Sequence, residues 1–133
     1  MKVQDLKNHM KTDNFANFLG IEVLEVAEGY AKTKLKMTKQ LYNYFDLGHG
    51  AAIYSVADVA FSYACNAQDH IKLAVALNVN INYIKKVEEN DILFAEAKLV
   101  STTGRTSLTD IVITNDKDEL VAKFEGLAYQ KTK

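Results

Sequence analysis

The sequence has no proline, no tryptophan, one cysteine and three scattered histidines. A single thiol, Cys65, excludes an internal disulfide, and its spacing from His9, His49 and His70 matches no zinc site, so we expect no metal. No run approaches the roughly 18 consecutive apolar residues of a membrane span, and the first residues lack the apolar stretch of a signal peptide. We therefore expect a cytoplasmic protein.

The chain also lacks an excess of either charge. Its 16 basic and 17 acidic side chains give a net charge of −1, without blocks of like charge. This balance excludes the broad basic surface that binds nucleic acid non-specifically. A chain of 133 residues can bury about two thirds of its unfolded surface and hold a core of its own. We expect one domain spanning residues 1–133.

The first third of the chain changes its hydrophobic period once. Apolar residues three to five apart predict a short amphipathic helix that ends near Gly20. From Ile21 the period becomes two, first over 21–26 and again over 31–37, with Glu28-Gly29 between the two stretches. This pattern predicts a β-hairpin.

The rest of the chain contains one long helix and four strands. From Ala51 to about Ala67 the residues are apolar on all sides, which is typical of a helix surrounded by protein. Four stretches rich in β-branched and aromatic residues, separated by short turns, predict an antiparallel meander: 73–84, 92–101, 107–115 and 120–129. The expected fold is α+β, with a curved antiparallel sheet wrapped around a long central helix.

Three polar residues interrupt the apolar helix before Asn66. Ser55, Asp58 and Ser62 are three and four residues apart, so they share one face. A carboxylate among Ala, Val and Phe must find hydrogen bonds, have a raised pKa or line a cavity. Asp58 is therefore either the first candidate for a site or a helix residue that bonds Ser55, Ser62 or a backbone amide.

The start of this helix offers a second candidate. Backbone N–H groups are unpaired at a helix N-terminus, and Gly50, without a Cβ, can bring its N–H close to a substrate carbonyl. This arrangement suits an oxyanion site. Gly50 and Asp58 are, however, eight residues apart, or about 12 Å along a helix. Two copies with antiparallel helices would bring Gly50 of one opposite Asp58 of the other, so the spacing predicts a dimer.

The segment from Leu41 to Asn66 resembles the hotdog-fold acyl-CoA thioesterases, in particular the phenylacetate-degradation branch. That branch carries an Asn, a His-Gly-Gly triplet and an Asp, matched here by Asn43, His49-Gly50 and Asp58. The resemblance implies a hotdog fold and hydrolysis of acyl-CoA, with an aromatic or short to medium acyl group, to a free acid and coenzyme A. It also implies a homodimer or a dimer of dimers, and no metal or redox cofactor.

The resemblance further assigns a role to each matching residue. Asp58 would be the nucleophile or the general base that activates water. The Gly50 N–H would polarise the thioester oxygen, and Asn43 would orient the water or the carbonyl. His49 would shape the loop and hydrogen-bond the site.

Three positions depart from the family pattern. The second glycine of the triplet is Ala51. A Ser or Thr that relatives often carry on the next strand corresponds to Ala76, so this group is either absent or replaced by Asn78. An Arg-Pro pair is replaced by Lys85-Lys86. These two lysines and Arg105 are our candidates for binding the coenzyme A phosphates, although each can also be an ordinary solvated charge.

Two other functions remain open at this stage. A hotdog dehydratase or isomerase needs a His that removes an α-proton, and only His49 is available. A non-catalytic hotdog protein that binds acyl-CoA is the second alternative, because Ala51 and Ala76 both lack groups that relatives carry.

Overall fold

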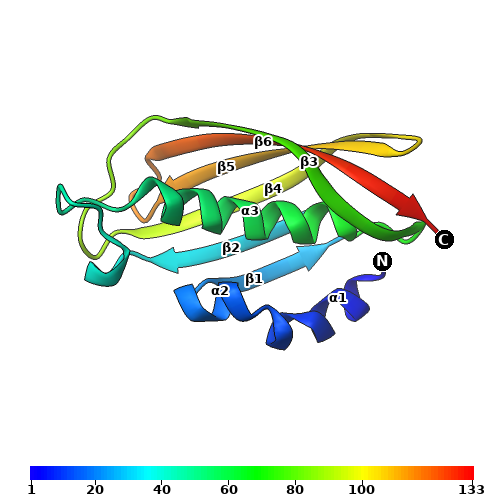
Figure 1. Cartoon of the computed structure of the whole chain (residues 1–133), viewed down its shortest axis with the longest axis horizontal. Coiled ribbons are helices and arrows are strands. Elements are labelled where there is room, and N and C mark those ends of the chain that lie inside the picture. The colour runs from blue at the N-terminus through cyan, green and yellow to red at the C-terminus, as the bar shows by residue number, and fades with distance from the viewer.

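The computed structural model describes residues 1–133 and contains one six-stranded antiparallel sheet with a long helix across one face (Figure 1). The strands are β1 (Glu22–Ala27), β2 (Tyr30–Lys36), β3 (Ile71–Tyr83), β4 (Ile92–Thr103), β5 (Thr106–Asn115) and β6 (Leu120–Thr132). The helices are α1 (Val3–His9), α2 (Asn14–Leu19) and α3 (Gly50–Asn66), with 3₁₀ turns η1 (Met10–Thr12) and η2 (Lys39–Leu41). The expected α+β architecture is confirmed.

The inner side of α3 packs against the concave face of the sheet. Val56, Ala57 and Ala60 are fully buried, and the Phe61 ring lies 5.9 Å from that of Phe124 on β6. Close packing here requires Gly126, because a Cβ at that position would lie 2.5 Å from the Phe61 ring. Neither α3 nor any other helix has the length and apolarity to span a bilayer.

The strand order is β1-β2-β4-β5-β6-β3, so the expected meander is only partly present. The last three strands, β4, β5 and β6, form a meander, but β3 pairs with β6 rather than with β4. The connection 84–91 leads from β3 at one side of the sheet to β4, which pairs with β2. A period of two predicts strands but not which strands pair. The connection between β3 and β4 is long enough to pass from one side of the sheet to the other.

The prediction of a single N-terminal helix is wrong. The segment forms α1, a 3₁₀ turn and α2, and the break lies at Asp13, whose carboxylate accepts a hydrogen bond from the Ala16 N–H (3.3 Å). Asp is a preferred N-cap residue, so the cap starts a new helix where the apolar spacing suggested continuity. The end at Gly20 is confirmed, because Gly20 adopts a left-handed conformation (φ +83°) that stops α2.

Candidate active site

A pocket of about 270 Å³ lies at the N-terminus of α3 and contains four of the predicted site residues. Asn43 comes from the loop before α3, Gly50 is the first residue of the helix, and Lys85 and Lys86 follow β3. The remaining lining residues are mostly apolar: Leu47, Gly48, Ile53, Tyr83, Ile84 and Val87. The structure thus brings together residues from two segments that lie far apart in the sequence.

The loop that leads into α3 is fixed by its own hydrogen bonds. The side-chain oxygen of Asn43 accepts hydrogen bonds from the N–H groups of Phe45 (2.8 Å) and Leu47 (3.3 Å). Gly48 donates its N–H to the Val87 carbonyl (2.7 Å), and a Cβ on Gly48 would come within 2.9 Å of Val87. The oxygen of Asn43 therefore shapes the loop, while its amide nitrogen makes no hydrogen bond within the chain.

The first turn of α3 leaves one backbone donor free. His49 is the N-cap, and its Nδ1 accepts a hydrogen bond from the Ala51 N–H (2.9 Å), as expected of a loop-shaping residue. The Gly50 N–H has no acceptor within the chain. It lies at the positive end of the helix dipole, so this N–H is disposed to bind a partial negative charge. The Tyr83 hydroxyl donates to the carbonyl of the same Gly50 (3.2 Å).

Asp58 lies on the side of α3 that faces away from the sheet. Its carboxylate is partly buried and makes no hydrogen bond or ion pair within the chain. Burial, and secondarily the charge of Asp13, raises the pKa of Asp58. Ser55 does not pair with it, because the Ser55 hydroxyl donates to the Ala51 carbonyl (2.7 Å). The alternative in which Asp58 only bonds its helix neighbours is therefore wrong.

Gly50 and Asp58 do not meet within one chain. Both lie on the straight helix α3, eight residues apart, which corresponds to about 12 Å along its axis. A thioester carbonyl bound to the Gly50 N–H is out of reach of the same chain's Asp58. The Gly50 N–H and the Asp58 carboxylate of one chain therefore cannot act on the same carbonyl.

Two predicted residues lie away from this pocket. Asn78 pairs with Leu127 on β6, and its side chain lies on the outer face of the sheet, opposite α3. Arg105 belongs to the turn between β4 and β5. Figure 1 shows this turn at the end of the sheet opposite the N-terminus of α3. The structure does not bring either side chain to the pocket within one chain.

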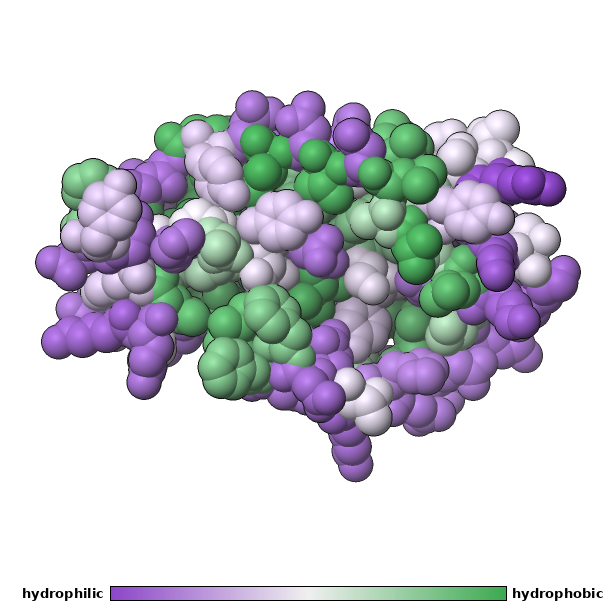
Figure 2. Space-filling model, in the orientation of Figure 1, coloured by the Kyte–Doolittle hydropathy of each residue, from purple (hydrophilic) through white to green (hydrophobic).

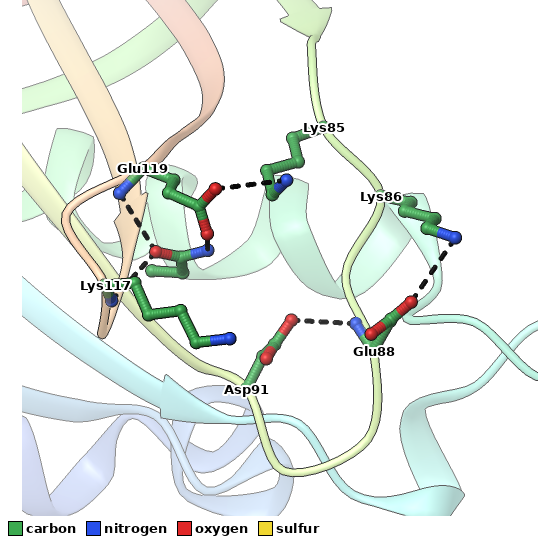
Figure 3. Close-up of polar contacts among 7 residues, drawn as sticks. Lys85, Lys86, Glu88, Asp91, Lys117 and Glu119 are labelled. Atoms are coloured by element: carbon green, nitrogen blue, oxygen red, sulfur yellow. Dashed lines mark hydrogen bonds and ion pairs between the residues drawn. The ribbon is translucent and has the colours of Figure 1, made fainter.

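The two lysines at the pocket mouth each have an acidic neighbour (Figure 3). The Lys85 ammonium lies 3.2 Å from Glu119, and that of Lys86 lies 3.3 Å from Glu88. A hydrogen bond from Asn115, with Lys85 as a second donor, lowers the pKa of Glu119. Exposed pairs of this kind contribute little to stability, so both ammonium groups can exchange these partners for another anion.

Comparison with known proteins settles the family. The family model described as the thioesterase superfamily matches residues 47–122, which is more than half of the chain. The chain belongs to the thioesterase superfamily. The matched region begins before the N-terminus of α3 and ends in β6, so it contains Gly50, Asp58 and both pocket lysines.

Similar proteins align with nearly the whole thioesterase chain. Acyl-coenzyme A thioesterase PaaI of Escherichia coli is 33% identical over 120 residues, which are 90% of this chain and 84% of the relative. The solved structure of the E. coli PaaI protein from the phenylacetic acid degradation operon has a TM-score of 0.91 and 32% identity, covering 96% of this chain and 91% of that one.

The TT0310 protein of Thermus thermophilus has a TM-score of 0.85 and 28% identity, covering 90% and 98% of the two chains. Together with the family match, these similarities confirm the expected hotdog fold and the expected thioester hydrolase.

Two residues at this site were missed by the sequence analysis. Tyr83 lines the pocket, and its hydroxyl donates a hydrogen bond to the Gly50 carbonyl. Its position directly before Ile84 and the two lysines was the available signal. Asp13, the N-cap residue of α2, contributes to the raised pKa of Asp58, and no spacing in the sequence connects these two carboxylates.

Proposed function

We propose that this thioesterase hydrolyses acyl-CoA to a free acid and coenzyme A at sites shared between two subunits. The observation that carries the proposal is a pair of unsatisfied groups on α3: the Gly50 N–H and the Asp58 carboxylate, neither of which has a hydrogen-bond partner within the chain. The similarity to E. coli PaaI, which is named as an acyl-coenzyme A thioesterase, supports acyl-CoA as the substrate.

In the proposed reaction the Gly50 N–H of one subunit binds the thioester oxygen, and Asp58 of the other acts on the thioester carbon. As general base, Asp58 takes a proton from water while the water oxygen forms a bond to that carbon. The C–S bond then breaks, and the proton passes to the thiolate that leaves as coenzyme A. The amide nitrogen of Asn43, which lines the same pocket as Gly50, is proposed to orient the carbonyl. The reaction consumes only water, without a metal or redox cofactor.

The raised pKa of Asp58 suits this role. Burial raises the pKa of Asp58, and a carboxylate in partly desolvated surroundings is a stronger base than one in water. A neutral imidazole has one unprotonated nitrogen, and in His49 this is Nδ1, which already accepts from the Ala51 N–H. Nε2 then carries the proton and cannot act as a general base. This hydrogen bond favours hydrolysis over the dehydratase or isomerase alternative.

The proposed dimer has a structural basis in β3. This 13-residue strand lies at the end of the sheet order, so one of its two edges has no neighbouring strand in the chain. Such an edge is a template for another chain. Two copies related by a two-fold axis through this edge would extend the sheet, and each would present α3 to the other.

A dimer of dimers is the proposed further assembly. Leu73, Val75 and Leu77 are exposed on β3, and the first two pair with residues on the outer face of β6. A two-fold axis at β3 would double this apolar patch, which suits contact with a second dimer.

The proposed phosphate contacts come from Lys85 and Lys86, at the mouth of the pocket that holds Gly50. Arg105, at the far end of the sheet, is proposed to contribute only from a second copy. Replacing Lys86 by Gln should raise KM about threefold with kcat unchanged, as befits an exposed charge. An unchanged KM would remove Lys86 from the phosphate site.

Subunit mixing tests the shared site. Asp58→Asn and Gly50→Pro should each be inactive. Proline is tolerated in the first helical turn, so Gly50→Pro removes the N–H without breaking α3, and Gly50→Ala, which keeps the N–H, is its control. An equal mixture should regain about one quarter of wild-type thiol release, because half of the dimers are mixed and each has one intact site. No recovery after subunit exchange, verified by mass spectrometry, would contradict shared sites.

The alternative function is non-catalytic binding of acyl-CoA. It is favoured by Ala76, which faces the helix side of the sheet opposite Ala128 and carries no hydroxyl. Binding of acyl-CoA by the wild type, measured by calorimetry, without thiol release from any acyl-CoA would establish this alternative.

A further inference from the structure

The turn between β5 and β6 reaches the pocket that holds Gly50. Its residues, 115–119, read Asn-Asp-Lys-Asp-Glu. The last of them, Glu119, lies 3.2 Å from the ammonium of Lys85, which lines the pocket. Figure 3 shows the two side chains pointing toward one another, one from this turn and one from the segment after β3. A carboxylate of the chain therefore pairs with one of the two cations proposed to bind phosphate.

One buried amide holds Glu119 in this position. Asn115 is only 4% exposed, and its side-chain oxygen accepts hydrogen bonds from the N–H groups of Lys117 (2.9 Å) and Glu119 (3.0 Å). Its side-chain nitrogen donates to the Glu119 carboxylate (3.1 Å). Asn115 thus fixes both the backbone of the turn and the direction of the carboxylate, so Glu119 is directed at Lys85 before any ligand binds.

The neighbouring ion pair lacks such an anchor. Lys86 and Glu88 lie 3.3 Å apart with side chains 67% and 61% exposed, against 43% for both Lys85 and Glu119. The Glu88 carboxylate has no other partner within the chain. Because exposed ion pairs contribute little to stability, stability does not account for the anchoring of Glu119. The anchored carboxylate instead affects which anion can reach Lys85.

The surroundings of Lys85 carry an excess of negative charge. Segments 84–91 and 115–119 contain six acidic and three basic side chains, and hydrophilic side chains project from this end of the molecule, at the left in Figure 2. The hydrogen bond from Asn115, and secondarily the one from Lys85, lowers the pKa of Glu119 and keeps it ionised. Lys117 makes no ion pair, and its charge also acts on Glu119. A displaced Glu119 carboxylate therefore has a second cation in its own turn.

Resting on the proposed function, we propose that Glu119 determines which anions bind at Lys85: a phosphate group displaces its carboxylate, and a second carboxylate does not. A phosphate monoester carries roughly two negative charges at neutral pH, and Coulomb attraction to one ammonium rises with that charge. A monoanion, such as the free acid that the reaction releases, attracts Lys85 no more strongly than Glu119 already does. Glu119 thus keeps the product off the pocket lysine and also raises the KM for acyl-CoA.

The test compares KM for hexanoyl-CoA with KM for hexanoyl-pantetheine, which has the same reacting thioester but no phosphate. Glu119→Gln keeps an oxygen for the hydrogen bond from Asn115 and removes the charge. It should lower KM for hexanoyl-CoA about fourfold and strengthen inhibition by free hexanoate about threefold. Both kcat and the KM for hexanoyl-pantetheine should stay within about 1.5-fold of the wild type.

Asp118→Asn is the matched control. It removes the same charge from the same turn, but the exposed Asp118 side chain pairs with no lysine. Asn also suits the left-handed conformation of this residue (φ +61°). KM for hexanoyl-CoA should therefore stay within about 1.5-fold of the wild type. In a Lys85→Gln background, Glu119→Gln should also change this KM by less than about 1.5-fold, because the cation for which the two anions compete is gone.

The outcomes separate the two proposals. If the thioesters are hydrolysed but Glu119→Gln leaves KM for hexanoyl-CoA unchanged or raises it, Glu119 is not a competing anion and the proposed function stands. The same follows if Asp118→Asn lowers this KM equally. If neither thioester is hydrolysed, the proposed function fails, and calorimetry with coenzyme A then decides on Glu119. Glu119→Gln should tighten the binding of coenzyme A about fourfold, and unchanged binding would contradict the proposal.

Discussion

The two sides of α3 differ in whether their groups find partners within the chain. On the inner side, Val56, Ala57 and Ala60 are fully buried against the sheet, and the Thr33 hydroxyl on β2 donates to the Val56 carbonyl (2.7 Å). On the outer side, the Gly50 N–H and the Asp58 carboxylate have no partner within the chain. One side is complete in a single chain, and the other carries polar groups for which the chain supplies no partner.

This difference separates stability from activity on one helix. Inner residues are small or apolar because space against the sheet is limited, so changes there should alter the free energy of unfolding. Asp58 contributes no internal contact that its removal would break, so changes there should alter the reaction. Variants on the two sides can therefore test whether this division holds.

The largest expected effect is on the outer side. Asp58→Asn keeps the shape of the side chain but cannot accept a proton from water, so kcat/KM for hexanoyl-CoA should fall about 10³-fold. Thiol release measures this rate. Asp110→Asn, at an exposed carboxylate on β5, is the control and should retain wild-type activity. Full activity in Asp58→Asn would remove Asp58 from the mechanism.

The largest expected effect on the inner side comes from Gly126. A Cβ at this position would lie 2.5 Å from the Phe61 ring, so Gly126→Val must displace Phe61 or bend β6. We expect the free energy of unfolding to fall by about 2–3 kcal/mol in urea denaturation. Glu125→Ala, at the exposed neighbouring position on β6, should change it by less than about 0.5 kcal/mol. Equal effects from these two variants would contradict the close packing described here.

A smaller effect is expected at Thr33. Thr33→Val preserves the shape of this buried side chain but removes the hydrogen bond to the Val56 carbonyl, which should lower the free energy of unfolding by about 1 kcal/mol. Thr33→Ser keeps the hydroxyl and separates loss of the hydrogen bond from loss of packing. Both variants should keep the wild-type kcat. A large fall in kcat with normal stability would break the proposed division of α3.

The smallest effect concerns pH and Asp58. Because burial raises the pKa of Asp58, the folded state binds this proton more tightly than the unfolded state. Asp58 therefore lowers stability as the pH rises from its unfolded pKa, about 3.9, through its folded pKa. Asp58→Asn should have a higher urea midpoint than the wild type at pH 7, and the difference should shrink toward pH 4. A less stable Asn variant at pH 7 would show that the carboxylate has stabilising contacts in the assembled protein.

Much of the fold could be predicted because the spacing of apolar residues and the local composition both reflect burial directly. The all-apolar stretch from Ala51 indicated a central helix, and the alternation after Ile21 indicated the first hairpin. Strand partners could not be predicted, because β3 has the same composition whether it pairs with β4 or with β6. The break at Asp13 was missed because helical spacing of apolar residues continues across it.

The site could be predicted in part for the same reasons. Asn43, Gly50 and the lysine pair lie together, whereas Asn78 lies on the opposite face from Ala76. A β-bulge between these two residues adds Leu77 and reverses the alternation, so residues two apart no longer share a face. A sequence read with a strict period of two places Asn78 beside the helix. A bulge of this kind leaves no reliable signal in composition.

The eight-residue spacing between Gly50 and Asp58 on α3 has a consequence for how the enzyme responds to dilution. If every site takes Gly50 from one copy and Asp58 from another, a dissociated chain has no active site at all, rather than a weakened one. Specific activity would then follow the fraction of associated chains, falling by mass action as the protein concentration passes below the dissociation constant. In that case the turnover rate measures the fraction of chains that are associated. Substrate held between two copies would itself favour their association.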